Sequence, residues 1–175
     1  MPDSLVDSRL GQVVIRPART TDVATIRRLV DTFSPDRRLL SKATVALYED
    51  VPEFLVADID GRVVGCGALH VMWEDLAEVR TLAVAPDSLG KGVGSAMLCA
   101  LLARANDIGV KRVFVLTFEV EFFQRFGFSE IDGTPVTHEV FEQLKKSYDE
   151  GVAEFLDLER VKPNTLGNTR MLLIL

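Results

Sequence analysis

The sequence predicts an α/β (α+β) fold in which a mixed central sheet is flanked by helices. Two apolar runs on either side of Asp60-Gly61 indicate a β-hairpin, because Asp-Gly favours the tight turn that joins antiparallel strands. A segment at 94–108 has apolar residues at the helical period and lies between two β-type runs. A strand, a crossover helix and a strand in this order predict a locally parallel pair within the sheet.

The composition is that of one ordinary globular domain. The chain has 175 residues, of which 47% are hydrophobic and 26% charged, and this mixture excludes intrinsic disorder and fibrous repeats. We expect residues 1–12 to form a flexible N-terminal arm and residues 13–175 to form the single domain. A net charge of −6 gives no general electrostatic reason to bind nucleic acid or an anionic membrane.

Three features of the sequence predict a cytoplasmic protein. The two cysteines, Cys66 and Cys99, lie in apolar runs, where a free thiol behaves as a small buried hydrophobe. The first twelve residues lack the basic and apolar regions of a signal peptide. No stretch reaches the roughly 20 apolar residues that a membrane span requires.

The first part of the chain predicts a strand followed by two helices. The β-branched run 13–15 is typical of a strand. Residues 22–32 carry apolar side chains at helical spacing, and the Thr and Asp residues before them can cap a helix. A second, short helix over about 41–49 should end near Val51-Pro52, because the residue before a proline avoids helical geometry.

The remaining elements follow from the same patterns. Runs 54–58 and 63–72 form the hairpin, and 78–84 adds a third strand that makes a meander. After the helix at 94–108, we expect a strand at 113–116, helices at 120–126 and 138–148, and a last strand at 170–175.

The segment from Leu89 to Ser95 contains three glycines at alternate positions, Gly90, Gly92 and Gly94. Such glycines let a backbone approach a ligand closely, and the unpaired N–H groups at the start of the next helix attract phosphate oxygens. The spacing matches neither the Walker loop, Gly-x4-Gly-Lys-Ser/Thr, nor the dinucleotide pattern Gly-x-Gly-x-x-Gly. A pyrophosphate-binding loop and a flexible turn are the two interpretations.

This loop resembles the acetyl-CoA loop of the GNAT superfamily of N-acetyltransferases, Arg/Gln-x-x-Gly-x-Gly/Ala after a strand that ends in an Ala-Val-like pair. The run 122–128 is similar to the Phe-Tyr-x-x-x-Gly-Phe motif of that superfamily. The resemblance implies a mostly antiparallel sheet, a pyrophosphate loop between the fourth strand and the third helix, and acetyl-CoA as cosubstrate. Leu89 stands at the usual Arg/Gln position, so one side-chain contact to phosphate is expected to be missing. The implied acetyl-CoA contacts are Leu82, Ala83, Val84, Leu89, Gly90, Lys91, Gly92, Val93, Gly94, Ser95, Phe122 and Phe123.

Other segments are similar to the N-acetylglutamate synthase group of amino-acid N-acetyltransferases, in the short form without an amino-acid-kinase domain. These segments are 66–69, 78–84, 114–117, Phe122-Phe123, 162–164 and 167–172. The resemblance implies acetyl transfer to the α-amino group of L-glutamate or a near analogue, at the head of arginine biosynthesis. L-Glutamine stays open as the acceptor, because Glu119 would disfavour a second carboxylate if it faced the pocket. The alternatives are a GNAT enzyme that acetylates a peptide, protein or small amine, and a non-catalytic acetyl-CoA-sensing module.

Acetyl transfer to an amine requires a proton acceptor, because an amine attacks a thioester only when it is neutral. Glu78 is the predicted general base, since it lies six residues before Val84 on the strand that leads to the loop, where the superfamily often carries a glutamate that acts through water. A solvated strand carboxylate is the alternative. Phe123 stands where many members carry a tyrosine that protonates the departing thiolate, so solvent or the ammonium nitrogen formed by the attack of the amine would supply that proton here.

An amino-acid substrate carries a carboxylate, which arginine recognises well. Arg80 shares strand parity with Glu78, so both side chains lie on one face if no bulge intervenes. We expect His70 across the hairpin from residues 79–80 and hence near Glu78, with a structural histidine as the alternative. Further substrate-binding candidates are the loop cations Arg38 and Lys42, which equally fit a solvated surface, and Asn168 and Arg170, which rest on the resemblance.

The expected partners are few. A small-molecule amino acid is the expected substrate, and a homodimer is an expectation from the superfamily. No group of Cys, His and Asp residues has metal-ligand spacing, so we expect no metal cofactor.

Overall fold

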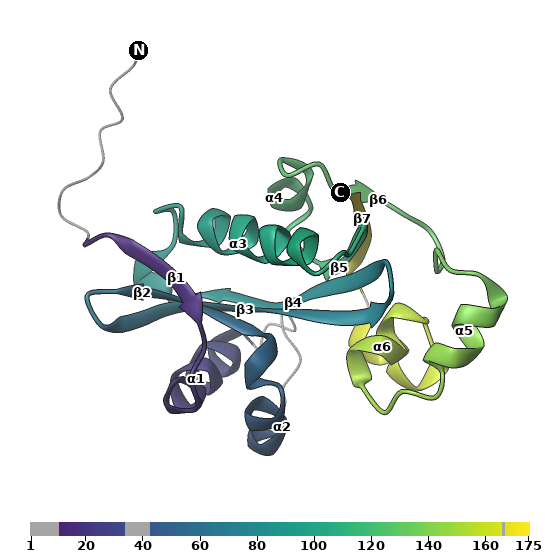
Figure 1. The fold of residues 1–175 in the computed structure, drawn as a ribbon, viewed down its shortest axis with the longest axis horizontal. Coiled ribbons are helices and arrows are strands. Elements are labelled where there is room, and N and C mark those ends of the chain that lie inside the picture. The colour runs from purple at the N-terminus through teal and green to yellow at the C-terminus, as the bar shows by residue number, and fades with distance from the viewer. Residues whose placement is uncertain (1–10, 34–42, 166) are drawn as a thin grey trace, which may run out of the picture.

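The computed structural model describes residues 11–33, 43–165 and 167–175, and in these ranges seven strands form one sheet with helices on both faces (Figure 1). The strand order is β1-β2-β3-β4-β5-β7-β6. Among these described strands, β4 and β5 pair in parallel and all other neighbours are antiparallel. The predicted mixed, mostly antiparallel sheet is therefore confirmed, whereas the predicted arm at 1–12 lies outside the described residues except for its last two.

The helices and strands follow the predicted order. The strands are β1 Val13–Pro17, β2 Phe54–Ile59, β3 Arg62–Trp73, β4 Leu76–Val84, β5 Arg112–Thr117, β6 Ser129–Glu130 and β7 Thr169–Ile174. The α-helices are α1 Val23–Phe33, α2 Thr44–Glu49, α3 Val93–Asp107, α4 Val120–Gln124, α5 His138–Leu144, α6 Glu150–Phe155 and α7 Lys162–Thr165. Single 3-10 turns occur at η1 Thr20–Asp22, η2 Val51–Glu53, η3 Pro86–Ser88 and η4 Glu159–Val161.

The predicted helix at 138–148 is wrong at its C-terminal end. Helix α5 ends at Leu144, and the chain turns before a separate helix, α6, begins. The Ser147 hydroxyl accepts a hydrogen bond from the Asp149 N–H, and the Asp149 carboxylate accepts one from Val152 N–H as the N-cap of α6. After Leu144 the N–H groups of Lys146 and Ser147 donate to carbonyls three residues back, so the α-helical hydrogen-bond pattern ends in a tighter turn, and α6 starts from its own N-cap.

The β2–β3 hairpin has the turn that its sequence predicts. Asp60 and Gly61 have φ angles of 51° and 84°, as a type I′ turn requires. The Asp58 carboxylate accepts a hydrogen bond of 2.7 Å from Gly61 N–H and so stabilises the turn.

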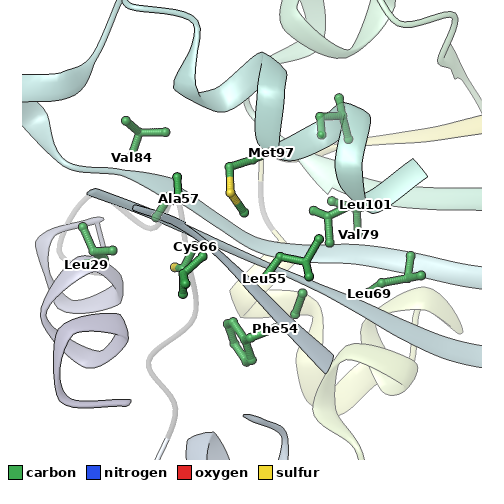
Figure 2. Packing of buried hydrophobic residues seen from close by; sticks show 14 of the residues in the cluster. Leu29, Phe54, Leu55, Ala57, Cys66, Leu69, Val79, Val84, Met97 and Leu101 are labelled. Atoms are coloured by element: carbon green, nitrogen blue, oxygen red, sulfur yellow. The ribbon is translucent and has the colours of Figure 1, made fainter. Parts of the chain in front are cut away.

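The hydrophobic core has two parts. The larger part packs α1 against one face of the sheet and α3 against the other, and Figure 2 shows Cys66 and Phe54 on the α1 side with Met97 and Leu101 on the α3 side. The smaller part includes Phe114 of β5 and Phe155 of α6, whose rings meet edge to face with centroids 5.0 Å apart. This second cluster attaches the segment after β6 to the α1 face of the sheet (Figure 1).

Within the described ranges, no helix combines the length and the apolar character needed to cross a bilayer.

Candidate active site

Strands β4 and β5 separate shortly after they begin. Their parallel pairing covers Leu76, Ala77 and Glu78 of β4, whereas β4 itself continues to Val84. In the described structure, the β5-facing edge of β4 therefore has no strand partner from residue 79 onward. Backbone N–H and C=O groups along such an edge need other partners, and a ligand that carries amide groups can supply them. Glu78 is the last paired residue and lies where the two strands part.

A β-bulge at Thr81 shapes the same part of β4. Ala68 of β3 pairs with Arg80, but Cys66 pairs with Ala83, so β4 has one extra residue at this point. Thr81 takes a φ of 57°, which is uncommon for a residue other than glycine. The bulge lies after Arg80, so Glu78 and Arg80 still share one face, as strand parity predicts.

The glycine loop joins β4 to α3. Gly90 and Gly92 have φ angles of 72° and 80°, and a Cβ at either position would meet no atom within 4 Å. Gly92 is the N-cap of the 15-residue helix α3 and provides no side-chain acceptor for its first N–H groups. An open loop before uncapped helical N–H groups suits a pyrophosphate group. Lys91 Nζ donates to the Asp87 carbonyl at 2.9 Å, and the Leu89 side chain is exposed.

The apolar residues predicted to contact acetyl-CoA lie around this loop. A Cβ on Gly94 would lie 3.7 Å from both the Phe122 ring and Val84, so α4 packs against the start of α3. Phe123 is buried and packs edge to face against Phe128, with ring centroids 5.2 Å apart. Among the remaining predicted acetyl-CoA contacts, Ala83, Val84 and Val93 are buried, whereas Leu82 and Ser95 are partly buried.

Glu78 and Arg80 form a buried ion pair beside the point where the strands separate. Arg80 Nη2 donates to Glu78 Oε2 at 2.8 Å, and the side chains of Arg80 and Glu78 are 7% and 8% exposed. Burial disfavours the charged guanidinium, but the negative charges of Glu78 and Asp149 outweigh it and raise the pKa of Arg80. Among the described residues, Arg80 Nε is buried without a hydrogen-bond partner.

The N-terminus of helix α6 brings an acidic residue to this ion pair. Arg80 Nη1 donates to the Asp149 carboxylate at 2.9 Å. A Cβ on Gly151 would clash with the Arg80 guanidinium, so the absence of a side chain there permits the close approach. Burial opposes ionisation of Asp149, but the hydrogen bonds from Arg80 and Val152 prevail and hold its pKa at about 2.

Glu154, which lies on α6, has a raised pKa, in contrast to Asp149. Its side chain is buried, and burial followed by the negative charge of Glu78 raises its pKa to about 8, although Arg80 opposes the shift. Glu154 therefore holds a proton at neutral pH while Asp149 is ionised.

His70 faces the same site from the neighbouring strand. It pairs with Glu78, not with residues 79–80 as predicted, because the second bulge of the hairpin, near Trp73, changes the register. Its Nδ1 lies 2.7 Å from Glu53 Oε1, and a carboxylate partner there favours a proton on Nδ1.

The other predicted substrate-binding residues have different positions. The Arg170 guanidinium donates to the carbonyl oxygens of Gly133, Glu154 and Phe155 and stacks on Phe114. These bonds tie β7 to the segment that carries α6. Asn168 lies just before β7, where its N–H donates to the Thr165 carbonyl. Arg38 and Lys42 lie outside the described residues.

Sequence reasoning missed Asp149, Glu154 and Glu53. Asp149 has a local signal, since an Asp before an acidic helical turn is a typical N-cap. No local signal connects it to Arg80, which lies 69 residues away. Within the described residues, no group of three or more His, Cys, Asp or Glu side chains could hold a metal ion.

Comparison with known proteins places this site in a family. Residues 23–128 match the family model described as acetyltransferase (GNAT) family. The chain belongs to the GNAT family. An amino-acid acetyltransferase of Mycobacterium tuberculosis is 60% identical to this GNAT chain over 165 residues, which cover 93% of this chain and 94% of the relative.

Solved structures agree with this assignment. The structure of Rv2747 from Mycobacterium tuberculosis in complex with CoA and NLQ has a TM-score of 0.90 and 60% identity, over 93% of this chain and 99% of that chain. The N-acetylglutamate synthase of Neisseria gonorrhoeae, complexed with coenzyme A and N-acetyl-glutamate, has a TM-score of 0.75 and 23% identity. This GNAT chain spans 35% of that synthase, and the likeness shows a shared fold.

Proposed function

We propose that this GNAT enzyme transfers the acetyl group of acetyl-CoA to the α-amino group of L-glutamate or L-glutamine, the first step of arginine biosynthesis. The observation that carries the proposal is the position of Glu78, a buried carboxyl on the last paired residue before β4 and β5 separate. The relationship to the amino-acid acetyltransferase of Mycobacterium tuberculosis, at 60% identity over most of both chains, supports the choice of an amino acid as acceptor.

In this proposal, acetyl-CoA binds to the glycine loop and to the edge of β4 where it separates from β5. The open N-terminus of α3 and the glycines at 90 and 92 suit the pyrophosphate. The unpaired edge of β4 suits the amide groups of the pantetheine arm, which would end near Glu78. Phe122 adds an apolar surface beside the loop.

Glu78 serves as the proton acceptor in this proposal. The substrate arrives as an ammonium ion, and Glu78 takes its proton directly or through water, so that the neutral amine can attack the acetyl carbon. Arg80, itself bound by Asp149, holds Glu78 in place. The carboxylates of Glu78 and Asp149 around one guanidinium leave a net negative charge, which attracts an ammonium group. The nearby phenylalanines have no ionisable proton, so the CoA thiolate takes its proton from solvent or from the ammonium nitrogen that forms when the amine attacks the thioester.

The test is CoA release from acetyl-CoA with glutamate, glutamine, other amino acids, polyamines and a lysine peptide as acceptors. We expect turnover with glutamate or glutamine and a drop in kcat of roughly 10²–10⁴-fold for Glu78→Gln. Glu130→Gln, which alters an exposed carboxylate on β6, is the matched control and should keep its activity. Thermal stabilisation by acetyl-CoA should be unchanged in both variants.

Other outcomes separate the alternatives. A preference for the peptide or the polyamine would leave the GNAT assignment intact and would exclude an amino acid as the acceptor. Stabilisation by acetyl-CoA without turnover on any amine would indicate a sensing module. Failure of the gene to restore growth without arginine to a strain that lacks N-acetylglutamate synthase would remove the pathway assignment.

A further inference from the structure

His70 is a histidine of the site that the proposed reaction leaves without a role. It pairs with Glu78 in the β3–β4 register, and residues directly opposite each other in an antiparallel pair point to the same face of the sheet. The Cβ atoms of such a pair lie roughly 4.5–5.5 Å apart. The His70 ring therefore lies beside the Glu78 carboxyl, within reach of a direct contact or of one bridging water.

Glu53 orients the His70 ring. It ends the turn η2, immediately before β2, and its Oε1 lies 2.7 Å from His70 Nδ1. This bond occupies one ring nitrogen and leaves the other, Nε2, for a different partner. The side chains of His70 and Glu53 are 20% and 27% exposed, whereas that of Glu78 is 8% exposed. The ring is therefore more accessible to solvent than the carboxyl beside it.

Two buried polar atoms of this group lack a partner among the described residues. They are Glu53 Oε2 and Arg80 Nε, and the described part of the chain has no other such side-chain atom. Glu53 binds His70 and Arg80 binds Glu78, so both atoms belong to one polar row across the sheet. Folded proteins rarely leave buried donors and acceptors unsatisfied. Their occurrence on the same row indicates that the row binds a polar ligand.

The charged groups around His70 come from three elements. They are Glu53 on η2, Glu78 and Arg80 on β4, and Asp149 on α6. Burial raises the pKa of Asp149, the bond from Arg80 lowers it, and a charge on His70 lowers it further, so the ring lies within electrostatic range of α6. Three carboxylates surround one guanidinium, and this arrangement offers a transferred proton a negatively charged environment.

We propose that His70 is the second proton acceptor of the site, which receives at Nε2 the proton that Glu78 removes from the substrate, and that Glu53 is the positioning residue that orients the ring. This inference rests on the proposed function, because the proton comes from the amine that is acetylated.

The proton follows a defined order of steps. An N–H bond of the substrate ammonium group breaks and Glu78 takes the proton. Glu78 gives it to His70 Nε2, directly or through one water, while the Nδ1 proton stays in the bond to Glu53. The neutral amine nitrogen then bonds to the acetyl carbon, the C–S bond breaks, and its electron pair leaves on the CoA sulfur. The second proton of the nitrogen reaches the thiolate through solvent, and the ring returns its proton to solvent.

The second transfer has a chemical advantage. In water an imidazole holds a proton roughly a hundredfold more tightly than a glutamate carboxylate, because their ordinary pKa values are about 6.5 and 4.3. Return of the proton to the amine is therefore less favourable from the ring than from the carboxyl. The transfer also leaves Glu78 ionised and bound to Arg80. The bond from Nδ1 to Glu53 serves both the neutral ring and the imidazolium, so the ring does not need to turn.

The first test is His70→Ala in the full chain, assayed by CoA release with its best amino-acid acceptor. We expect kcat to fall about a hundredfold with little change in the KM for the amino acid. Added imidazole should raise the kcat of this variant about tenfold, because it can occupy the place of the ring. Pyrazole, a ring of the same size but a far weaker base, should not. His138→Ala, which removes an exposed histidine at the start of α5, is the matched control and should keep its activity.

Glu53→Gln tests the positioning role. The amide oxygen can still accept a hydrogen bond from Nδ1 but has no charge to hold an imidazolium, so kcat should fall about tenfold. Combined with His70→Ala, it should cause no further loss, because Glu53 acts through the ring. Glu49→Gln, which alters an exposed glutamate at the end of α2, is the control and should match the wild type.

A third readout does not depend on activity. In protein labelled with ¹⁵N at histidine, the ring spectrum at about pH 8 should show His70 with a proton on Nδ1 and none on Nε2. A proton on Nε2 and none on Nδ1 would overturn the inference, because Nε2 could then not receive the proton from Glu78.

Failure of the inference and failure of the proposed function give different results. An active wild type whose His70→Ala variant keeps its kcat, or loses only affinity for the amino acid, would overturn the inference and leave the proposed function. Equal rescue by imidazole and pyrazole would also overturn it, because filled space and not a base would explain the recovery. If His70→Ala does not fold, an unchanged kcat in Glu53→Gln overturns the inference. Absence of acetyl transfer by the wild type to any amine would remove the proposed function and this inference with it.

Discussion

Asp149 provides a direct test of how α6 is joined to the sheet. Its carboxylate binds Arg80 at 2.9 Å and also caps α6 through Val152 N–H. Asparagine at this position keeps an oxygen for the cap but loses the charge that faces Arg80. Asp149→Asn therefore isolates the ion pair from the helix cap.

The size of the effect follows from the pKa of Asp149. A pKa of about 2, against the usual 3.8, corresponds to roughly 2.5 kcal/mol of folding free energy at pH 7, since one pKa unit is about 1.4 kcal/mol. Because the folded pKa is below the unfolded one, this stability is complete well above pH 3.8 and is lost as the pH falls towards 2. About half of it should be gone at pH 3.

Urea unfolding of wild type and Asp149→Asn at pH 7, 5, 4 and 3 measures this loss. We expect a difference of about 2–3 kcal/mol at pH 7 that narrows towards pH 3. Glu150→Gln, next to it in an exposed ion pair with Arg160, is the control and should cost within about 0.5 kcal/mol. A penalty for Asp149→Asn that is the same at every pH would refute the reasoning, because it would not come from the carboxylate charge.

Two other predictions concern the loop and the cysteines. Gly92→Ala places a side chain at a φ of 80°, which should lower the free energy of unfolding in urea by about 1–2 kcal/mol. It should also raise the KM for acetyl-CoA more than it lowers kcat, and an unchanged KM would argue against a pyrophosphate contact at this loop. Cys66 is fully buried, and burial raises the pKa of its thiol to about 12, whereas Cys99 is exposed. Ellman's reagent should therefore react with one thiol in the native protein and with two in guanidinium, and rapid reaction of both in the native state would contradict the described burial.

Features that depend on neighbouring residues could be predicted from the sequence. Asp60-Gly61 predicted its hairpin because both residues tolerate the left-handed backbone of the turn. The period of 94–108 predicted α3, and the glycines before it predicted an open helix N-terminus. Glu78 and Arg80 were predicted on one face because strand residues two apart share a side, and the bulge comes only after them.

Contacts across the sheet could be predicted only in part. His70 was expected near Glu78 from the short hairpin connection, yet its exact partner depended on bulges that no residue type specifies. Its contact with Glu53 joins β3 to the turn before β2, and pairs of this kind depend on how two elements meet.

The charge balance of the site was decided by tertiary structure alone. Sequence by itself determined the hairpin, the strand–helix–strand step and the glycine-rich turn before α3, because each rests on backbone preferences within a few residues. Glu78 was predicted from the resemblance to the superfamily, and only the structure shows that it ends the β4–β5 pairing. Whether that carboxyl has the acidic neighbours Asp149 and Glu154 depends on where α6 packs, and α6 is placed by Phe155 in the second core cluster and by Arg170. Ionisation in a buried site responds to every charge within a few ångströms, whatever their separation along the chain. For that reason the protonated state of Glu154 had no signal in the sequence.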